Sequence, residues 1–222
     1  MTEKELKQKF DFTLLTKVLN LNEDDELSDS ILEELILSNK NLKNLVIKNS
    51  ILKKLELNNT ELNKAYFGHS IFENCQMVNF CSTESMFKES VFVKCRATGS
   101  LLHDSDFKDI TFKACKLDLA NFRFSILKNI TFEDCDLSGA DFYQASMQNV
   151  KFSGCNLDAT EFSDAKLKKV DLRESDIINL KGLSSIKGAI ITTNQLITIA
   201  PVLAEQLGIM VKDRGEISNL SD

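Results

Sequence analysis

A solenoid, in which short repeats stack into a rod, is the fold class that this 222-residue sequence predicts. The first observation is a period of five. Every fifth residue from Leu32 to Ile177 is large and apolar at 28 of 30 positions, the exceptions being Ser82 and Ala97. The second observation is a period of twenty, at which five cysteines recur: Cys75, Cys95, Cys115, Cys135 and Cys155. Neither a helix nor a plain strand repeats every five residues, so stacked units are indicated.

The composition narrows the function classes. Hydrophobic residues make up 43% of the chain, enough for a core, and 27 basic against 33 acidic residues give a net charge of −6. This mildly acidic balance argues against a dedicated nucleic-acid-binding protein. The N-terminus lacks the apolar core of a signal peptide, and no apolar run is long enough to span a membrane. We therefore expect a cytoplasmic protein without membrane contact, in which the cysteines are reduced thiols.

Residues 1–26 are expected to form an N-terminal helix and an acidic linker. Leu6, Phe10, Leu14 and Val18 recur every four residues, which predicts an amphipathic helix over residues 3–20. The acidic run at residues 23–26 suits a solvated linker. The helix could plug the N-terminal end of the rod. It could also lie over an apolar column at a position that is normally exposed, Ile31, Ile51, Ile71 and Val91.

Residues 27–181 carry the repeat. Two residues before each large position lies a second ordered site, usually a small side chain such as Ala120 or Ala140, as in the units ADFYQ and CNLDA. This pattern resembles the pentapeptide-repeat family, whose A(D/N)LXX units the chain matches over roughly residues 30–180. The resemblance implies an all-β solenoid, a right-handed quadrilateral β-helix with five residues per side and twenty per coil. Its coils would stack into a rod of roughly 36 Å, given strand spacings of about 4.8 Å.

Columns of residues twenty apart support four sides independently of that resemblance. Phe72, Phe92, Phe112, Phe132 and Phe152 would stack on one side. Outward lysines form a basic stripe at Lys48, Lys88, Lys108, Lys128 and Lys168. The adjacent side carries acidic residues that are candidates for partner binding: Glu61, Glu84, Asp104, Asp141, Glu161 and Asp164. These charges are explained either by a solvated surface or by an acidic strip for a basic partner.

Residues 182–222 leave the repeat and are expected to form a C-terminal helical cap, a dimerisation segment and a tail. Thr192 and Gln195 suit a capping box, Gly208 suits a helix end, and Pro201 should kink the helix or start a second one. A homodimer interface would use the surplus apolar residues Leu196, Ile199, Val202, Leu203 and Leu207. The tail pattern GAI…QL…LA..LGI.V resembles the quinolone-resistance (Qnr/MfpA-type) branch of the family. That resemblance implies a dimer joined through C-terminal helices, which mimics duplex DNA and binds DNA gyrase and topoisomerase IV.

Candidate chemistry is sparse, and we expect no enzyme, no cofactor and no metal site. The cysteine interval equals one coil, so the five cysteines should be buried free thiols beside leucines, not a disulfide set or a zinc site. His69 and His103, the only histidines, fall at outward turn positions on different sides, and Cys81 lies off the cysteine column. Between residues 75 and 100 the pattern weakens. There Phe80 could fill the space that Ser82 vacates, or the stretch could form a bend or a binding site.

Two functions follow from these expectations. The first is a non-catalytic DNA mimic that binds a type II topoisomerase and either protects it from quinolones or inhibits it. Residues 30–180 carry 19 basic and 21 acidic side chains, so only a local acidic strip could perform the mimicry. The alternative is a structural or adaptor solenoid for an unknown protein partner, using the isoleucine column or the lysine stripe.

Overall fold

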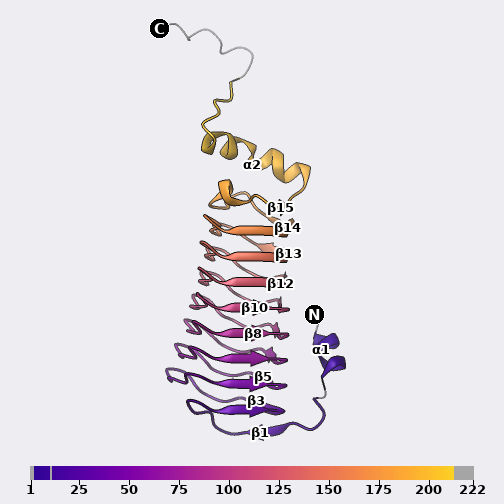
Figure 1. Cartoon of the computed structure of the whole chain (residues 1–222), viewed down its shortest axis with the longest axis vertical. Helices are drawn as coiled ribbons and strands as arrows, with labels where there is room; N and C mark the ends of the chain where they lie inside the picture. The colour runs from indigo at the N-terminus through magenta and orange to yellow at the C-terminus, as the bar shows by residue number, and fades with distance from the viewer. Residues whose placement is uncertain (1–2, 11, 213–222) are drawn as a thin grey trace.

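The computed structural model describes residues 3–10 and 12–212, which form a β-solenoid of about 8 turns with a helix near each end. Helix α1 lies alongside the stack, and helix α2 lies across its far end (Figure 1). The helices are α1 (Glu3–Lys9), the short 3₁₀ helix η1 (Leu183–Ser185) and α2 (Thr193–Gln206). The expected β-helix with terminal helices is therefore confirmed as a fold class.

Fifteen strands make up the solenoid in the described residues. Most strands have three residues because each side of a coil is only five residues long. The strands are β1 (Thr16–Val18), β2 (Glu26–Ser28), β3 (Ser30–Glu33), β4 (Val46–Lys48), β5 (Ile51–Lys53), β6 (Tyr66–Gly68), β7 (Ile71–Glu73), β8 (Met86–Lys88), β9 (Val91–Val93), β10 (Asp106–Lys108), β11 (Thr111–Lys113), β12 (Ile126–Glu133), β13 (Ser146–Asn156), β14 (Lys166–Asp176) and β15 (Ala189–Ile190).

Four parallel ladders join each coil to the next, which confirms four sides per coil. Strands β2, β4, β6, β8 and β10 form one side, and β1, β3, β5, β7, β9 and β11 form the next. Strands β12, β13 and β14 are long enough to turn the corner between these two sides. Isolated bridges such as Gln76↔Arg96 make the third side, and bridges such as Asn121↔Asp141 make the fourth. Partners are twenty residues apart in all pairs from β2 to β13, as the cysteine interval predicts, and the exceptions lie at the two ends of the rod.

A left-handed residue turns every corner. From Asp24 to Lys169 every fifth residue has φ between about +46° and +65°, and only Gly99, Gly139 and Gly154 among them are glycines. This conformation is costly for residues with a Cβ, so coil-to-coil hydrogen bonds must hold it. The turn residue Asn44 donates its backbone N–H to the carbonyl of Asn63 in the following coil at 3.0 Å. The same bond recurs along the rod, for example from Asp104 to Arg123.

Stacked aromatic rings fill the centre. Along the phenylalanine column predicted from the sequence, ring centroids are 4.3 to 5.1 Å apart in successive coils. Phe122, Phe142 and Phe162 form a second stack with centroids 5.0 and 5.3 Å apart. Buried hydroxyls at the small inward sites are satisfied, as when Thr60 donates to the carbonyl of Leu37 at 2.8 Å. The core therefore runs unbroken along the rod.

The N-terminal helix is shorter than predicted. It ends at Lys9, and Thr16–Val18 instead forms strand β1, paired with Ser30–Leu32 of β3. The expected helix over residues 3–20 is wrong beyond Lys9, because the open edge of the first coil offers partners to the backbone of residues 16–18. Leu14 is accordingly 84% exposed and not part of an apolar helix face.

The C-terminal cap begins with tight backbone contacts. Gly182 has φ +71°, and a Cβ there would lie 2.3 Å from the backbone nitrogen of Ser163. Helix α2 then starts at the predicted capping box, with reciprocal hydrogen bonds between Thr192 and Gln195. It continues through Pro201 to Gln206, so no second helix starts there, and Gly208 follows with φ +69°. Residues 213–222 of the expected tail lie outside the described residues.

The last coil departs from the repeat register. Ser153 pairs with Glu174 instead of residue 173, and register returns at Asn156↔Asp176. The side-chain amide of Gln195 explains part of this change, because it donates to the carbonyls of Leu172 and Ser175 at 2.8 Å each. These carbonyls therefore bond to the cap instead of to another coil.

Candidate functional site

The predicted acidic residues share one side of the solenoid, but they form two groups there. Glu61, Glu84 and Asp104 lie in coils near the middle of the rod, and Asp141, Glu161 and Asp164 lie nearer α2. In the column of isolated bridges, Cys81, Leu101 and Asn121 separate Glu61 from Asp141. The one coil of this side that separates Asp104 from Asp141 is that of Asn121, where Phe124 is half-exposed. The structure therefore contains a middle acidic group and an upper acidic group, where the sequence suggested one strip.

Basic side chains neutralise part of each group. In the upper group, Nε of Arg123 pairs with Oδ2 of Asp141 at 2.8 Å, while its guanidinium lies 4.9 Å from the centre of the Tyr143 ring. In the middle group, Lys64 approaches Glu84 at 3.9 Å, and Nδ1 of His103 contacts Oδ2 of Asp104 at 2.7 Å. Only Glu61, Glu161 and Asp164 among the six carboxylates have no ion pair among the described residues.

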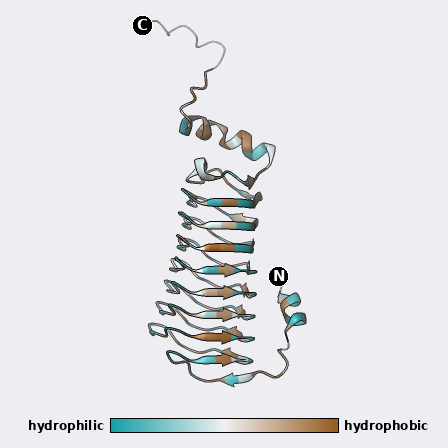
Figure 2. Ribbon diagram, viewed as in Figure 1, coloured by the Kyte–Doolittle hydropathy of each residue, from teal (hydrophilic) through white to brown (hydrophobic). Residues whose placement is uncertain are grey.

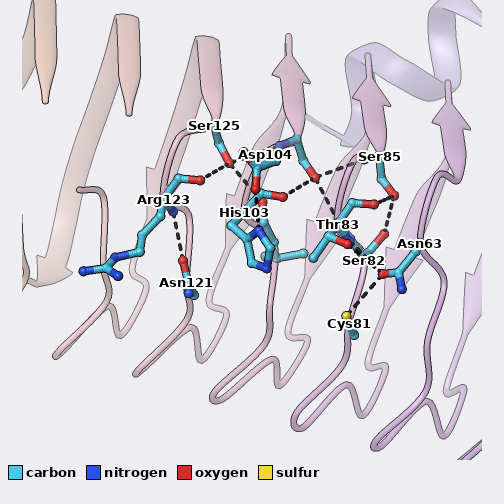
Figure 3. Close-up of polar contacts among 12 residues, drawn as sticks. Asn63, Cys81, Ser82, Thr83, Ser85, His103, Asp104, Asn121, Arg123 and Ser125 are labelled. Carbon is cyan, nitrogen blue, oxygen red and sulfur yellow. Dashed lines mark hydrogen bonds and ion pairs between the residues drawn. The ribbon is translucent and has the colours of Figure 1, made fainter. Parts of the chain in front are cut away.

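A network of small polar side chains underlies the middle group (Figure 3). Ser85, Ser105 and Ser125 are buried at the inward small site, and the hydroxyl of Ser105 accepts from the backbone N–H of Ser85 at 3.1 Å. Nearer the surface, the side-chain oxygen of Asn63 accepts from the hydroxyl of Thr83 at 3.0 Å. The sequence signal for this network is the run of serines at a site that elsewhere holds alanine. Its effect is to fix the backbone that presents the acidic residues.

Cys81 belongs to this network and not to a reactive centre. Its thiol donates to the side-chain oxygen of Asn63 at 3.2 Å. Burial raises the pKa of the Cys81 thiol, and the charge of Glu61 raises it further. A thiol must lose its proton to act as a nucleophile, so this environment works against reactivity.

The five cysteines of the column are buried free thiols. Each donates to a carbonyl of the preceding coil, as Cys95 does to Phe72 at 3.5 Å, and burial raises the pKa of the Cys95 thiol well above its usual value. Within residues 3–10 and 12–212, no three His, Cys, Asp or Glu side chains lie close enough together to hold a metal ion. The column thus packs as small apolar groups.

The weak stretch between residues 75 and 100 keeps its strand register. Phe80 is fully buried beside the small, buried Ser82. This supports the interpretation that the large side chain of Phe80 fills the space that Ser82 leaves, and not that the rod bends here. A void of about 20 Å³ remains where Ala97 replaces a larger side chain, lined by Phe92, Leu117 and neighbouring core residues. This volume is about that of one water molecule, in apolar surroundings that disfavour water.

The predicted lysine stripe is confirmed by the strand register. Lys88 of β8 pairs with Lys108 of β10, which pairs with Lys128 of β12. Lys48 lies one coil beyond Gly68, and Lys168 lies one coil beyond Gln148. We call the five lysines the lysine ladder. They share one side of the rod, next to the acidic side.

Helix α1 covers the isoleucine column, which decides between its two expected positions. Leu6 is fully buried against Ile71 and Val91, and Phe10 and Phe12 pack at the margin. Lys9 pairs with Glu89. The ring of Phe10 stacks on His69 with centroids 4.1 Å apart, so His69, expected at an exposed turn, lies partly under the helix. Burial lowers the pKa of His69, although Glu89 lies 3.7 Å away.

The five residues predicted for a dimer interface divide between two roles. Ile199 is 1% exposed and packs in the solenoid core, so its assignment to a dimer interface is corrected, and Leu203 packs partly against the same core. Leu196, Val202 and Leu207 point outward, with Leu207 69% exposed. This exposed apolar surface also includes Ile197, Ile209, Met210 and Val211. Figure 2 shows several hydrophobic segments along α2. A hollow of about 380 Å³ lies between Ile197, Pro201 and Val211.

In the described residues, these side chains lie on the inner and outer faces of a β-solenoid of about 8 turns. The family description pentapeptide repeat region matches residues 65–137 and 125–185, which together span more than half of the chain. The chain belongs to the pentapeptide repeat family. No curated protein matches the sequence significantly. No helix among the described residues combines the length and apolarity that a membrane span requires.

Solved structures of the same kind are similar at low identity. HetL, a pentapeptide repeat protein involved in heterocyst differentiation regulation in the cyanobacterium Nostoc, is 14% identical over 76% of this chain and 90% of its own, with a TM-score of 0.43. Full-length QnrB1, a plasmid-mediated fluoroquinolone resistance protein, is 19% identical over 81% of this chain and 100% of its own, with a TM-score of 0.36. A pentapeptide repeat protein of the Arabidopsis thaliana thylakoid lumen is 19% identical over 44% of this chain and 65% of its own, with a TM-score of 0.28.

Proposed function

We propose that this protein is a non-catalytic, homodimeric solenoid that binds a type II topoisomerase through its acidic side. The observation that carries the homodimer is the outer surface of α2. Ile199 closes the core, while Leu196, Val202 and Leu207 remain exposed at the end of a stiff rod. An exposed apolar surface of this kind needs a partner. A second copy, related by a two-fold axis, would cover it and double the length of the rod.

The acidic side would then meet the topoisomerase at two places. The centres of the middle and upper acidic groups are between three and four coils apart, or roughly 17 Å at a coil spacing of about 4.8 Å. Duplex DNA of that length carries roughly ten phosphates, one per about 1.7 Å. The six carboxylates, two of which pair with Lys64 and Arg123, therefore suit specific contacts with two basic patches better than a continuous imitation of the DNA backbone.

A supercoiling assay tests this proposal with purified DNA gyrase and topoisomerase IV. We expect the protein to inhibit supercoiling or to protect it from a fluoroquinolone. The variant Asp141→Asn/Glu161→Gln/Asp164→Asn should weaken that effect at least tenfold, because it removes the upper acidic group. The control Glu56→Gln/Asp118→Asn/Asp158→Asn changes three carboxylates on another side of the rod and should retain the effect. The topoisomerase function is refuted if neither enzyme binds the protein or responds to it.

The dimer is tested separately by light scattering during gel filtration. We expect twice the mass of one chain, and we expect Leu196→Asp/Leu207→Asp to give a monomer with an unchanged circular dichroism spectrum. The control Leu14→Asp places a charge at another exposed leucine and should leave the dimer intact. A dimer that survives the double substitution would show that its interface lies elsewhere.

A second candidate function, an adaptor solenoid for a different protein, is favoured by the lysine ladder. The isoleucine column gives this function less support, because the N-terminal segment packs over its Ile51, Ile71 and Val91 within the same chain.

A further inference from the structure

The lysine ladder places like charges side by side. Lys88, Lys108 and Lys128 occupy the same position in adjacent parallel strands, about 4.8 Å apart from coil to coil. Lys88 has Glu89 at 3.8 Å, whereas Lys108 and Lys128 have no carboxylate within ion-pairing distance among the described residues. Like charges directly opposite one another in a sheet are destabilising. An anionic group that bridges them would remove this repulsion.

A hollow adjoins the ladder. Side chains two residues apart in a strand point to the same face, so Met86, Asp106 and Ile126 stand beside the three lysines. Met86 is 43% exposed and Ile126 is 53% exposed. The short Asp106 between them leaves a hollow of about 180 Å³, lined by these three side chains and the three lysines. Its size suits one large apolar side chain, with Met86 and Ile126 as walls.

The strands that carry the hollow, β8, β10 and β12, offer no free edge to a partner. Each of them already pairs with strands in the coils on both sides of it. A ligand must therefore be recognised by side chains, and not by adding a strand to the sheet.

We propose that this side binds an extended acidic peptide through the ladder, with one large apolar side chain of the peptide in the hollow. The three lysines span about 9.6 Å. Side chains on the same face of an extended peptide are about 6.7 Å apart, so two of its carboxylates fall within reach of the lysines. This proposal rests on the adaptor function and names the chemical class of its partner, an acidic peptide. It is independent of topoisomerase binding.

The hollow favours a peptide over other anions. A nucleic acid would bring its phosphates towards Asp106 and would find Tyr66 as the one aromatic side chain of this column for base stacking. A lipid bilayer would meet the lysines but would not fill a hollow of this size with a single anchored side chain. Both alternatives therefore become arms of the test.

Fluorescence anisotropy tests the inference with the full-length protein and a fluorescein-labelled peptide that has one central leucine and four glutamates on each side. We expect binding that weakens at least tenfold in Lys108→Gln/Lys128→Gln and about fivefold in Ile126→Ser. Replacing the peptide's leucine by serine should produce a loss similar to that of Ile126→Ser. The control Lys94→Gln/Lys116→Gln removes two lysines outside the ladder and should change the affinity less than twofold.

The following results would contradict the peptide proposal. Absence of peptide binding would overturn the proposal, as would an equal loss in the ladder and control variants. Ladder-dependent binding of a single-stranded oligonucleotide, or of phosphatidylserine vesicles, that exceeds peptide binding would assign the surface to that ligand instead. The ladder variant should retain any effect on gyrase, so the two proposals can fail separately.

Discussion

The two terminal helices cover different surfaces of the solenoid. Helix α2 is part of the solenoid, because Ile199 enters the core and Gln195 bonds to the last coil's carbonyls. Helix α1 lies against the outside of the rod, held by Leu6, Phe10 and the Lys9–Glu89 pair. A seven-residue helix is too short to be stable alone, so α1 exists only while it is docked. The contrast teaches that an exposed end of a solenoid requires a cap, whereas an apolar column on its side needs only a removable cover.

The largest expected effect comes from Ile199. Ile199→Ala should lower the free energy of unfolding by about 3 kcal/mol, since it empties a buried site at the end of the core. Urea denaturation followed by circular dichroism measures this change. Leu119→Ala, at a site on the side of the rod that is 64% exposed, should change it by less than about 0.5 kcal/mol. Equal effects in the two variants would show that α2 does not close the solenoid as described.

Leu6→Ala should release α1 without unfolding the rod. Removing a buried leucine costs about 2–5 kcal/mol, which exceeds what the remaining contacts of a short helix can supply. Limited proteolysis should then cut near residues 7–9, while the thermal midpoint of the solenoid stays close to that of the parent protein. Leu14→Ala, at an exposed site, should leave the cleavage pattern unchanged. Persistent protection in Leu6→Ala would mean that the aromatic contacts alone hold the helix.

Gln195→Ala tests the bond between α2 and the last coil. It removes one half of the capping box and two hydrogen bonds to backbone carbonyls, so we expect a loss of about 1–2 kcal/mol in stability. Thr198→Ala removes a hydroxyl bond within the helix and provides a milder comparison. Hydrogen exchange of residues 170–176 should rise in Gln195→Ala alone.

The smallest expected effect is on the pH dependence of α1 docking. Because burial lowers the pKa of His69, the docked state binds fewer protons than the released state. Docking is therefore favoured above the ordinary histidine pKa of about 6.5 and weakens as pH falls below it. Lys9, Lys88 and Glu89 also face this ring. The hydrogen bond from Lys9 lowers the pKa of Glu89, which adds a second weakening only below about pH 4.5.

Proteolysis of α1 between pH 7 and pH 5 measures this dependence. Cleavage should increase towards pH 5, and His69→Gln should flatten the increase while keeping a flat polar side chain against Phe10. An unchanged profile in that variant would show that another group titrates.

The repeat part of the fold follows from the sequence because one physical constraint recurs thirty times. Each large apolar residue must point inward, and Phe72, Phe92 and Phe112 therefore define the coil length and the register of the lysines. The same reasoning fails at the ends. Residues 16–18 form a strand and not the predicted helix, because they pair with β3. The spacing of the apolar residues alone could not show which side of α2 faces the core. The repeat also predicts the side on which the acidic residues lie, but it does not predict their pairing with Arg123 and Lys64, which depends on side-chain reach.

The left-handed corner residues have a consequence for how such a chain can change its length. Because every corner is made in the same way and every coil uses twenty residues, inserting or deleting one whole coil preserves all four ladders, whereas a change of one residue would turn every later side chain away from its place. The distance between the two acidic groups, and from each of them to the α2 surface, can therefore change only in steps of about 4.8 Å.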